Sequence, residues 1–164
     1  MQNFFEPKAN QDKLKQEIDR WIGTPYQHMG FSSGGMDCTK FVGIVLVNLG
    51  ILQSFDKRVY YPTDWYIHGG EEICLNAIES TMTRYLNKDL DVQKILYSGF
   101  EQSIEVGDLV CISKNAKGFV NHTALYLGDD KIAHCVQGKG VCISQFSFSY
   151  SKRTKYLFRL FYKD

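Results

Sequence analysis

Hydrophobic positions recur at helical spacing in the first half of the chain and at strand spacing in the second. Over residues 11–22 apolar side chains return every three to four positions, which predicts an amphipathic helix with Asn10 as its N-cap. Residues 38–49 are almost continuously apolar, and a run of this length favours a buried helix over a strand. A weaker helical period over residues 71–86 predicts a third helix.

The predicted buried helix has residues at both ends that favour helix termini. Asp37 precedes it and belongs to the residue types that cap helix N-termini, while Gly50 follows it and fits a C-terminal stop. A glycine-rich loop over residues 30–35 leads into the cap. Cys38 is therefore expected in the first turn of this helix.

Five short segments in the second half have the composition and length of strands. They cover residues 109–113, 122–127, 131–136, 141–145 and 156–162. Gly-Asp-Asp at residues 128–130 separates the second segment from the third and is a tight-hairpin signal. Helices followed by an antiparallel sheet of about five strands predict an α+β fold. We expect one domain over residues 1–164, in which residues 56–101 form an insertion-like helical segment.

The overall charge limits the class of partner. With 19 Lys and Arg against 18 Asp and Glu the net charge is +1, whereas a protein that binds duplex nucleic acid would show a concentrated basic face. Residues 139–164 are locally basic, which fits a solvated tail or, as the alternative, attraction to a polyanionic surface. Residues 1–10 are polar and no apolar run is long enough to cross a bilayer, so the sequence predicts neither a signal peptide nor a membrane span.

One of the five cysteines has a position that suits chemistry. The odd number and the lack of a Cys-x-x-Cys pair argue against a disulfide framework and against a structural zinc site. At a helix start, partial positive charge and free N–H groups would favour the Cys38 thiolate and would bind an oxyanion. The alternative is a small buried core residue, as expected for Cys74, Cys111, Cys135 and Cys142.

Two histidines flank the predicted hairpin turn. His122 opens one strand and His134 lies near the end of the other, 12 residues further on, so the hairpin brings them opposite or diagonally adjacent. One imidazole would take the proton of the Cys38 thiol, while the other would hydrogen-bond the second ring nitrogen of this base and fix its tautomer. The alternatives are two unrelated strand histidines, or a zinc site shared with Cys38 that would lack a recognised ligand spacing.

Several motifs, taken in order, resemble those of the NlpC-type peptidoglycan cysteine peptidases, which are papain-like. Residues 37–42 resemble the Asp-Cys-Ser-Gly-Phe-Val signature of that family. Upstream, residues 21–26 resemble the Gly-x-Pro-Tyr segment of the family. Downstream, residues 106–110 resemble its Pro-Gly-Asp-Leu stretch, and residues 122–129 resemble His-Val-Gly-Ile-Tyr-Leu-Gly. Residues 131–135 resemble the segment that carries the third catalytic residue. The ordered set is more specific than any one motif.

The resemblance implies a reaction and the residues that perform it. Cys38 would be the nucleophile, His122 the general base and His134 the residue that orients the base. The substrate would be a peptidoglycan stem peptide or muropeptide, often cut between D-glutamate and a diamino acid, and no cofactor is needed. Rival functions are acyl transfer or hydrolysis of a non-wall amide, and a wall- or phage-tail-associated binding module without catalysis.

The same resemblance assigns substrate contacts and marks departures from the family. Tyr26 would line the active site, unless it is only a core aromatic residue. Asp37 would help to bind the free amine of the substrate, unless it serves only as an N-cap. Thr39 and Lys40 replace the common Ser-Gly pair, and the charge of Lys40 would alter the preferred substrate.

The insertion-like segment and the route of delivery are less defined by the sequence. Residues 62–65 and the helix after them resemble the single-domain, phage-tail-associated branch of the family, and His68 fits a loop histidine. Without a signal peptide the chain would reach a wall by lysis, on a phage-like tail or by injection, or would act on wall peptides in the cytoplasm. The sequence does not choose among these routes and does not give an oligomeric state.

Overall fold

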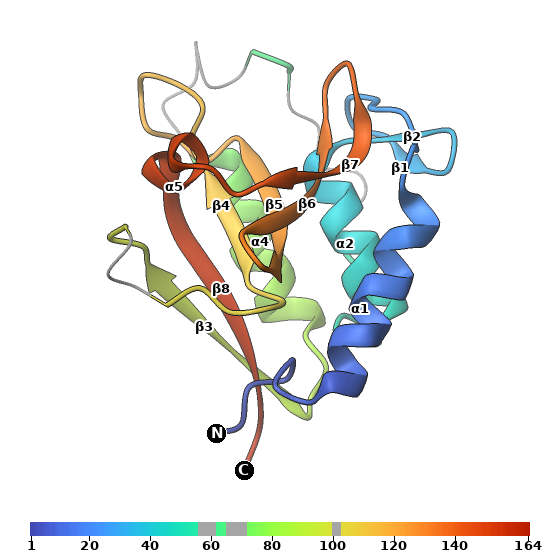
Figure 1. Cartoon of the computed structure of the whole chain (residues 1–164), viewed down its shortest axis with the longest axis vertical. Helices are drawn as coiled ribbons and strands as arrows, with labels where there is room; N and C mark the ends of the chain where they lie inside the picture. The colour runs from blue at the N-terminus through green and yellow to red at the C-terminus, as the bar shows by residue number, and fades with distance from the viewer. Residues whose placement is uncertain (56–61, 65–71, 100–102) are drawn as a thin grey trace.

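A six-stranded antiparallel sheet organises the structure, and three helices cover one of its faces (Figure 1). The computed structural model describes residues 1–55, 62–64, 72–99 and 103–164. The strands are β3 Leu90–Leu96, β4 Leu109–Ile112, β5 His122–Gly128, β6 Lys131–Val136, β7 Gly140–Gln145 and β8 Thr154–Tyr162. They lie side by side in the order β3-β8-β4-β5-β6-β7. The α+β prediction is therefore confirmed.

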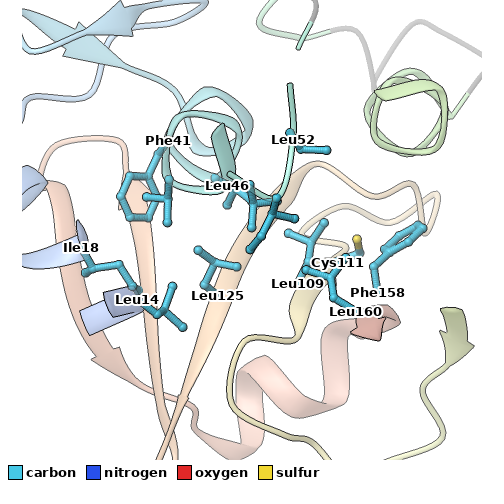
Figure 2. Packing of buried hydrophobic residues seen from close by; sticks show 14 of the residues in the cluster. Leu14, Ile18, Phe41, Leu46, Leu52, Leu109, Cys111, Leu125, Phe158 and Leu160 are labelled. Carbon is cyan, nitrogen blue, oxygen red and sulfur yellow. The ribbon is translucent and has the colours of Figure 1, made fainter. Parts of the chain in front are cut away.

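Apolar stripes hold the helices to the sheet. The covering helices are α1 Lys8–Trp21, α2 Cys38–Asn48 and α4 Ile73–Tyr85. Leu14 of α1 and Phe41 of α2 are buried and meet Leu125 of β5 in one apolar cluster (Figure 2). The other face of the sheet carries a second apolar cluster, against which Tyr150 of the short helix α5 Phe148–Arg153 packs. Among the helices in the described ranges, none combines the length and the apolar character needed to cross a membrane.

The N-cap predicted at Asn10 is wrong, because α1 begins earlier, at Lys8, after Pro7. The Asn10 side chain instead donates through Nδ2 to the Phe4 carbonyl at 2.7 Å and to the Tyr162 hydroxyl at 2.9 Å. These bonds fasten the N-terminal segment to the end of β8. A partner so distant in sequence leaves no local signal, whereas the capping preference of Asn is local and favoured the wrong boundary.

The sheet contains one strand more than the five predicted. β3 lies at the edge of the sheet and pairs antiparallel with β8 along its whole length. Most of its residues are at least partly exposed and several are polar, which weakens the strand signal. The segment 56–101 thus holds a strand besides its predicted helix, whereas His68 lies outside the described residues.

The hairpin predicted between β5 and β6 is confirmed. Asp129 and Asp130 in the turn have positive φ angles of 49° and 53°. A tight turn with positive φ at both central residues matches the right-handed twist of the strands that it joins. Leu125 lies opposite Ala133 in the β5–β6 register. His134 comes one position after Ala133, so it lies diagonally across the two strands from His122, on the same face.

Gly138 in the β6–β7 turn and Gly140 at the start of β7 lie near the point where the loop after α1 meets the sheet. The Val141 N–H donates to the Thr24 carbonyl at 2.8 Å, so the loop before Tyr26 runs against β7. Gly138 and Gly140 have positive φ angles of 83° and 77°. A Cβ on Gly140 would lie 2.2 Å from the Thr24 carbonyl oxygen, whereas a Cβ on Gly138 would meet nothing within 4 Å.

These two glycines therefore form a matched pair for a stability measurement. We expect Gly138→Ala to lower the free energy of unfolding by about 1 kcal/mol, through backbone strain alone. Gly140→Ala should lower it by about 3 kcal/mol, because the added methyl must also push Thr24 away from β7. Urea denaturation of the two variants measures the difference. Equal losses would contradict the close approach of the loop to the strand.

Candidate active site

Cys38 is the first residue of α2, and the residue before it caps the helix. The Asp37 carboxylate accepts hydrogen bonds through Oδ1 from the Lys40 N–H at 2.8 Å and the Thr39 hydroxyl at 2.9 Å. Its Oδ2 accepts a bond from the Met29 N–H at 3.1 Å. The N-cap predicted at Asp37 is confirmed. The cap holds the turn that presents Cys38 and ties it to Met29, just before the glycine-rich loop.

Burial sets the charge of Cys38 at rest. The side chain is only 8% exposed and lies against the Thr123 backbone of β5. Burial, aided by the negative charge of Asp37, raises the pKa of the Cys38 thiol to about 11, although hydrogen bonding from Thr123 and the charge of Lys114 act in the opposite direction. The thiolate expected from the helix N-terminus is therefore wrong for the resting site. Desolvation of a charged sulfur outweighs the helix dipole here.

His122 and His134 form a buried chain of hydrogen bonds that continues to β7. His122 Nε2 lies 2.8 Å from His134 Nδ1, and His134 Nε2 lies 2.8 Å from the Ser144 hydroxyl oxygen. His122 is 5% exposed and His134 is fully buried. The contact between the two histidines that the hairpin predicted is confirmed. Only Nδ1 of His122 remains outside this chain of bonds.

Both histidines are neutral at pH 7. Burial, together with the positive charge of Lys114, lowers the pKa of His122 well below 6.5. The same two causes lower the pKa of His134 to about 4. Neither these histidines with Cys38 nor any other trio of His, Cys, Asp or Glu within the described ranges is arranged as a group of metal ligands.

The residues predicted to contact substrate take different positions. Tyr26 is half-buried, and burial together with the charges of Cys38 and Asp37 raises the pKa of its hydroxyl to about 12, so Tyr26 lies near Cys38. Lys40 is only 5% exposed and, with Thr39, lines a cavity between α2 and α4. The substrate-binding roles of these four residues stay predictions.

The chain between residues 23 and 159 matches the model of the NlpC/P60 family. This chain belongs to the NlpC/P60 family. The matched stretch contains Cys38, His122 and His134 and begins just after α1.

Several known NlpC/P60 proteins are similar to this chain. A protein of Haemophilus influenzae, named a probable endopeptidase NlpC homolog, is 26% identical over 141 residues, which make up 86% of this chain and 57% of that protein. An NlpC/P60 family protein of Bacillus cereus superposes with a TM-score of 0.57 at 21% identity, over 90% of this chain and 39% of its own. The NlpC/p60 domain of the peptidoglycan hydrolase SagA superposes with a TM-score of 0.54 at 19% identity, over 90% and 96% of the two chains. The fold is therefore the papain-like α+β fold of NlpC/P60 domains.

Two polar residues of this NlpC/P60 site were not found from the sequence. Ser144 becomes recognisable only from the β6–β7 register, which places His134 opposite Cys142 and so brings the next inward-facing residue of β7 close. Lys114 follows β4 in a polar loop, where a lysine is expected to be solvated. Its effect on the two histidines depends on contacts made in three dimensions, which no local pattern reports.

Proposed function

We propose that this chain is a cysteine peptidase that hydrolyses an amide bond in peptidoglycan stem peptides. The observation that carries the proposal is the buried chain of hydrogen bonds from His122 through His134 to Ser144. The Cys38 thiol, at the start of α2, lies against Thr123, the residue after His122. The names of its relatives, a probable endopeptidase and a peptidoglycan hydrolase, support the same substrate class.

The site would work from an uncharged resting state. With both histidines neutral, a proton on His122 Nε2 donates to His134 Nδ1, and a proton on His134 Nε2 donates to the Ser144 hydroxyl. This arrangement leaves the lone pair of His122 Nδ1 available to the Cys38 thiol. It favours proton transfer during attack over a preformed ion pair, because burial disfavours both charges.

The reaction follows the usual steps of acyl transfer through a thioester. His122 Nδ1 takes the Cys38 proton while the sulfur attacks the amide carbonyl, and the first-turn N–H groups of α2 that Asp37 does not cap stabilise the oxyanion. The imidazolium then protonates the leaving amine. Water attacks the thioester, its proton passes to His122 and then to sulfur, and a free carboxylate is released. His134 keeps the imidazole oriented through each proton transfer.

The family resemblance points to the bond between D-glutamate and a diamino acid. The test is to incubate the protein with purified muropeptides and to identify new amino termini by mass spectrometry. Release of a fragment that begins with the diamino acid supports the proposal. Intact muropeptides after prolonged incubation with folded protein would overturn it, and transfer of the acyl group to an added amine without net hydrolysis would reassign the protein as an acyltransferase.

A further inference from the structure

We propose that Lys114 binds a free carboxylate of the substrate next to the scissile amide and so selects stem peptides that carry this group. The inference rests on the proposed function and adds the residue that determines its specificity. It starts from an exposed cation that the fold holds beside the two histidines.

The Lys114 backbone is anchored next to the catalytic strand. Its N–H donates to the Asn121 side chain at 2.7 Å, and Asn121 is the residue before His122. In the β4–β5 register Ile112 lies opposite His122, so Lys114 comes two residues beyond that pair. The loop that contains Lys114 is therefore held in a fixed position relative to His122.

The ring of Tyr150 contacts both the Lys114 side chain and His134. Lys114 Nζ lies 5.6 Å from the centre of the Tyr150 ring, and that ring meets His134 edge-on with 5.6 Å between centres. A cation over an aromatic face is attracted to it, which restricts the side chain. Lys114 nevertheless remains exposed, so a ligand can reach its ammonium group.

The positive charge of Lys114 lies in a groove with other cations. Across the described ranges, Lys114 forms no ion pair with a carboxylate. It lines a surface groove with Lys152, Arg153 and Lys155, and the described lining of that groove holds no Asp or Glu. A cationic groove without carboxylates attracts anions. The charge of Lys114 also acts on Cys38 and His122, so an anion bound to it would lie close to the reacting atoms.

The proposed scissile bond supplies an anion in that place. When a glutamyl residue is linked through its side-chain carboxyl group, its α-carboxylate stays free, a short distance along the same residue from the carbonyl under attack. A charge-assisted hydrogen bond from an ammonium group suits this carboxylate, whereas the neutral carboxamide of the amidated residue cannot replace its charge. Lys114 would thus distinguish the two forms.

Two synthetic peptides provide the experiment. They are L-Ala-γ-D-Glu-L-Lys-D-Ala and the same peptide with the α-carboxylate converted to a carboxamide. We expect the wild-type protein to cleave the carboxylate peptide with a kcat/KM about tenfold higher, the size expected for one charged hydrogen bond at a partly exposed site. Lys114→Met should bring the ratio close to one, and Lys114→Arg should retain most of it. Lys152→Met, which removes another exposed cation of the same groove, should leave the ratio unchanged.

The ratio isolates binding from the chemistry of the sulfur. Loss of the Lys114 charge also changes the pKa values of Cys38 and His122, but that change affects both peptides equally and cancels in the ratio. Equal cleavage of both peptides by the wild-type protein, or an unchanged preference in Lys114→Met, would overturn the role of Lys114 and leave the peptidase proposal intact. If the wild-type protein cleaves neither peptide nor muropeptides, both proposals fall together.

Discussion

Cys38→Ala is expected to lower the rate of muropeptide hydrolysis by at least about 10³-fold, because the covalent route is lost with the sulfur. The methyl side chain of alanine still fits at the start of α2, and the Asp37 cap does not involve the sulfur. The variant should therefore stay folded. Steady-state hydrolysis, followed by mass spectrometry of released amines, measures the loss.

The matched control is Cys74→Ala. Cys74 lies near the start of α4, is partly buried and packs against the same apolar cluster, so its truncation removes a similar volume from the interior. This variant should keep nearly full activity and a comparable midpoint of thermal unfolding. Residual activity of Cys38→Ala within a few-fold of the wild-type rate would rule out the sulfur as nucleophile.

His122→Ala should lower the rate by about 10³-fold, within the range that a general base contributes. His134→Ala should cost less, about 10²-fold, because it removes only the group that orients the base. Ser144→Ala should cost a few-fold, since its hydroxyl is one bond further along the chain. The order of the three losses, measured as kcat/KM on one peptide, tests whether His122 acts first in the series of hydrogen bonds from His122 through His134 to Ser144. A larger loss for Ser144→Ala than for His122→Ala would contradict it.

Alkylation of Cys38 as a function of pH separates the neutral pair from an ion pair. Only the thiolate reacts, and the thiol has a pKa raised to about 11, so the rate of labelling by iodoacetamide should still be rising above pH 9. An imidazolium beside the sulfur would stabilise the thiolate and lower this pKa. Because His122 is neutral, His122→Ala should leave the profile almost unchanged, and an upward shift of several pH units would instead show that the two residues rest as ions.

The sequence predicted the parts of the site that depend on local pattern. The long apolar run after Asp37 defined α2 and placed Cys38 at its start, and the Gly-Asp-Asp turn brought His122 and His134 together. In each case a turn or a cap, which is encoded within a few residues, fixed the geometry.

The parts that were missed depend on contacts between distant segments. Asn10 is held by Phe4 and Tyr162 rather than by its own helix start. Ser144 joins the histidines through the pairing of β6 with β7. The pKa of Cys38 was predicted to shift in the wrong direction, because a helix end can be recognised from the sequence, whereas the desolvation around the sulfur cannot.

The enclosure of Cys38 also bears on how long the protein stays active outside a reducing environment. Peroxide and similar oxidants convert thiolates to sulfenic acid and beyond, and they react poorly with a protonated thiol. If the Cys38 thiol loses its proton only during attack on a substrate, it reacts slowly with such oxidants between turnovers. An enzyme built in this way would survive in an aerobic medium without a partner that repairs its cysteine.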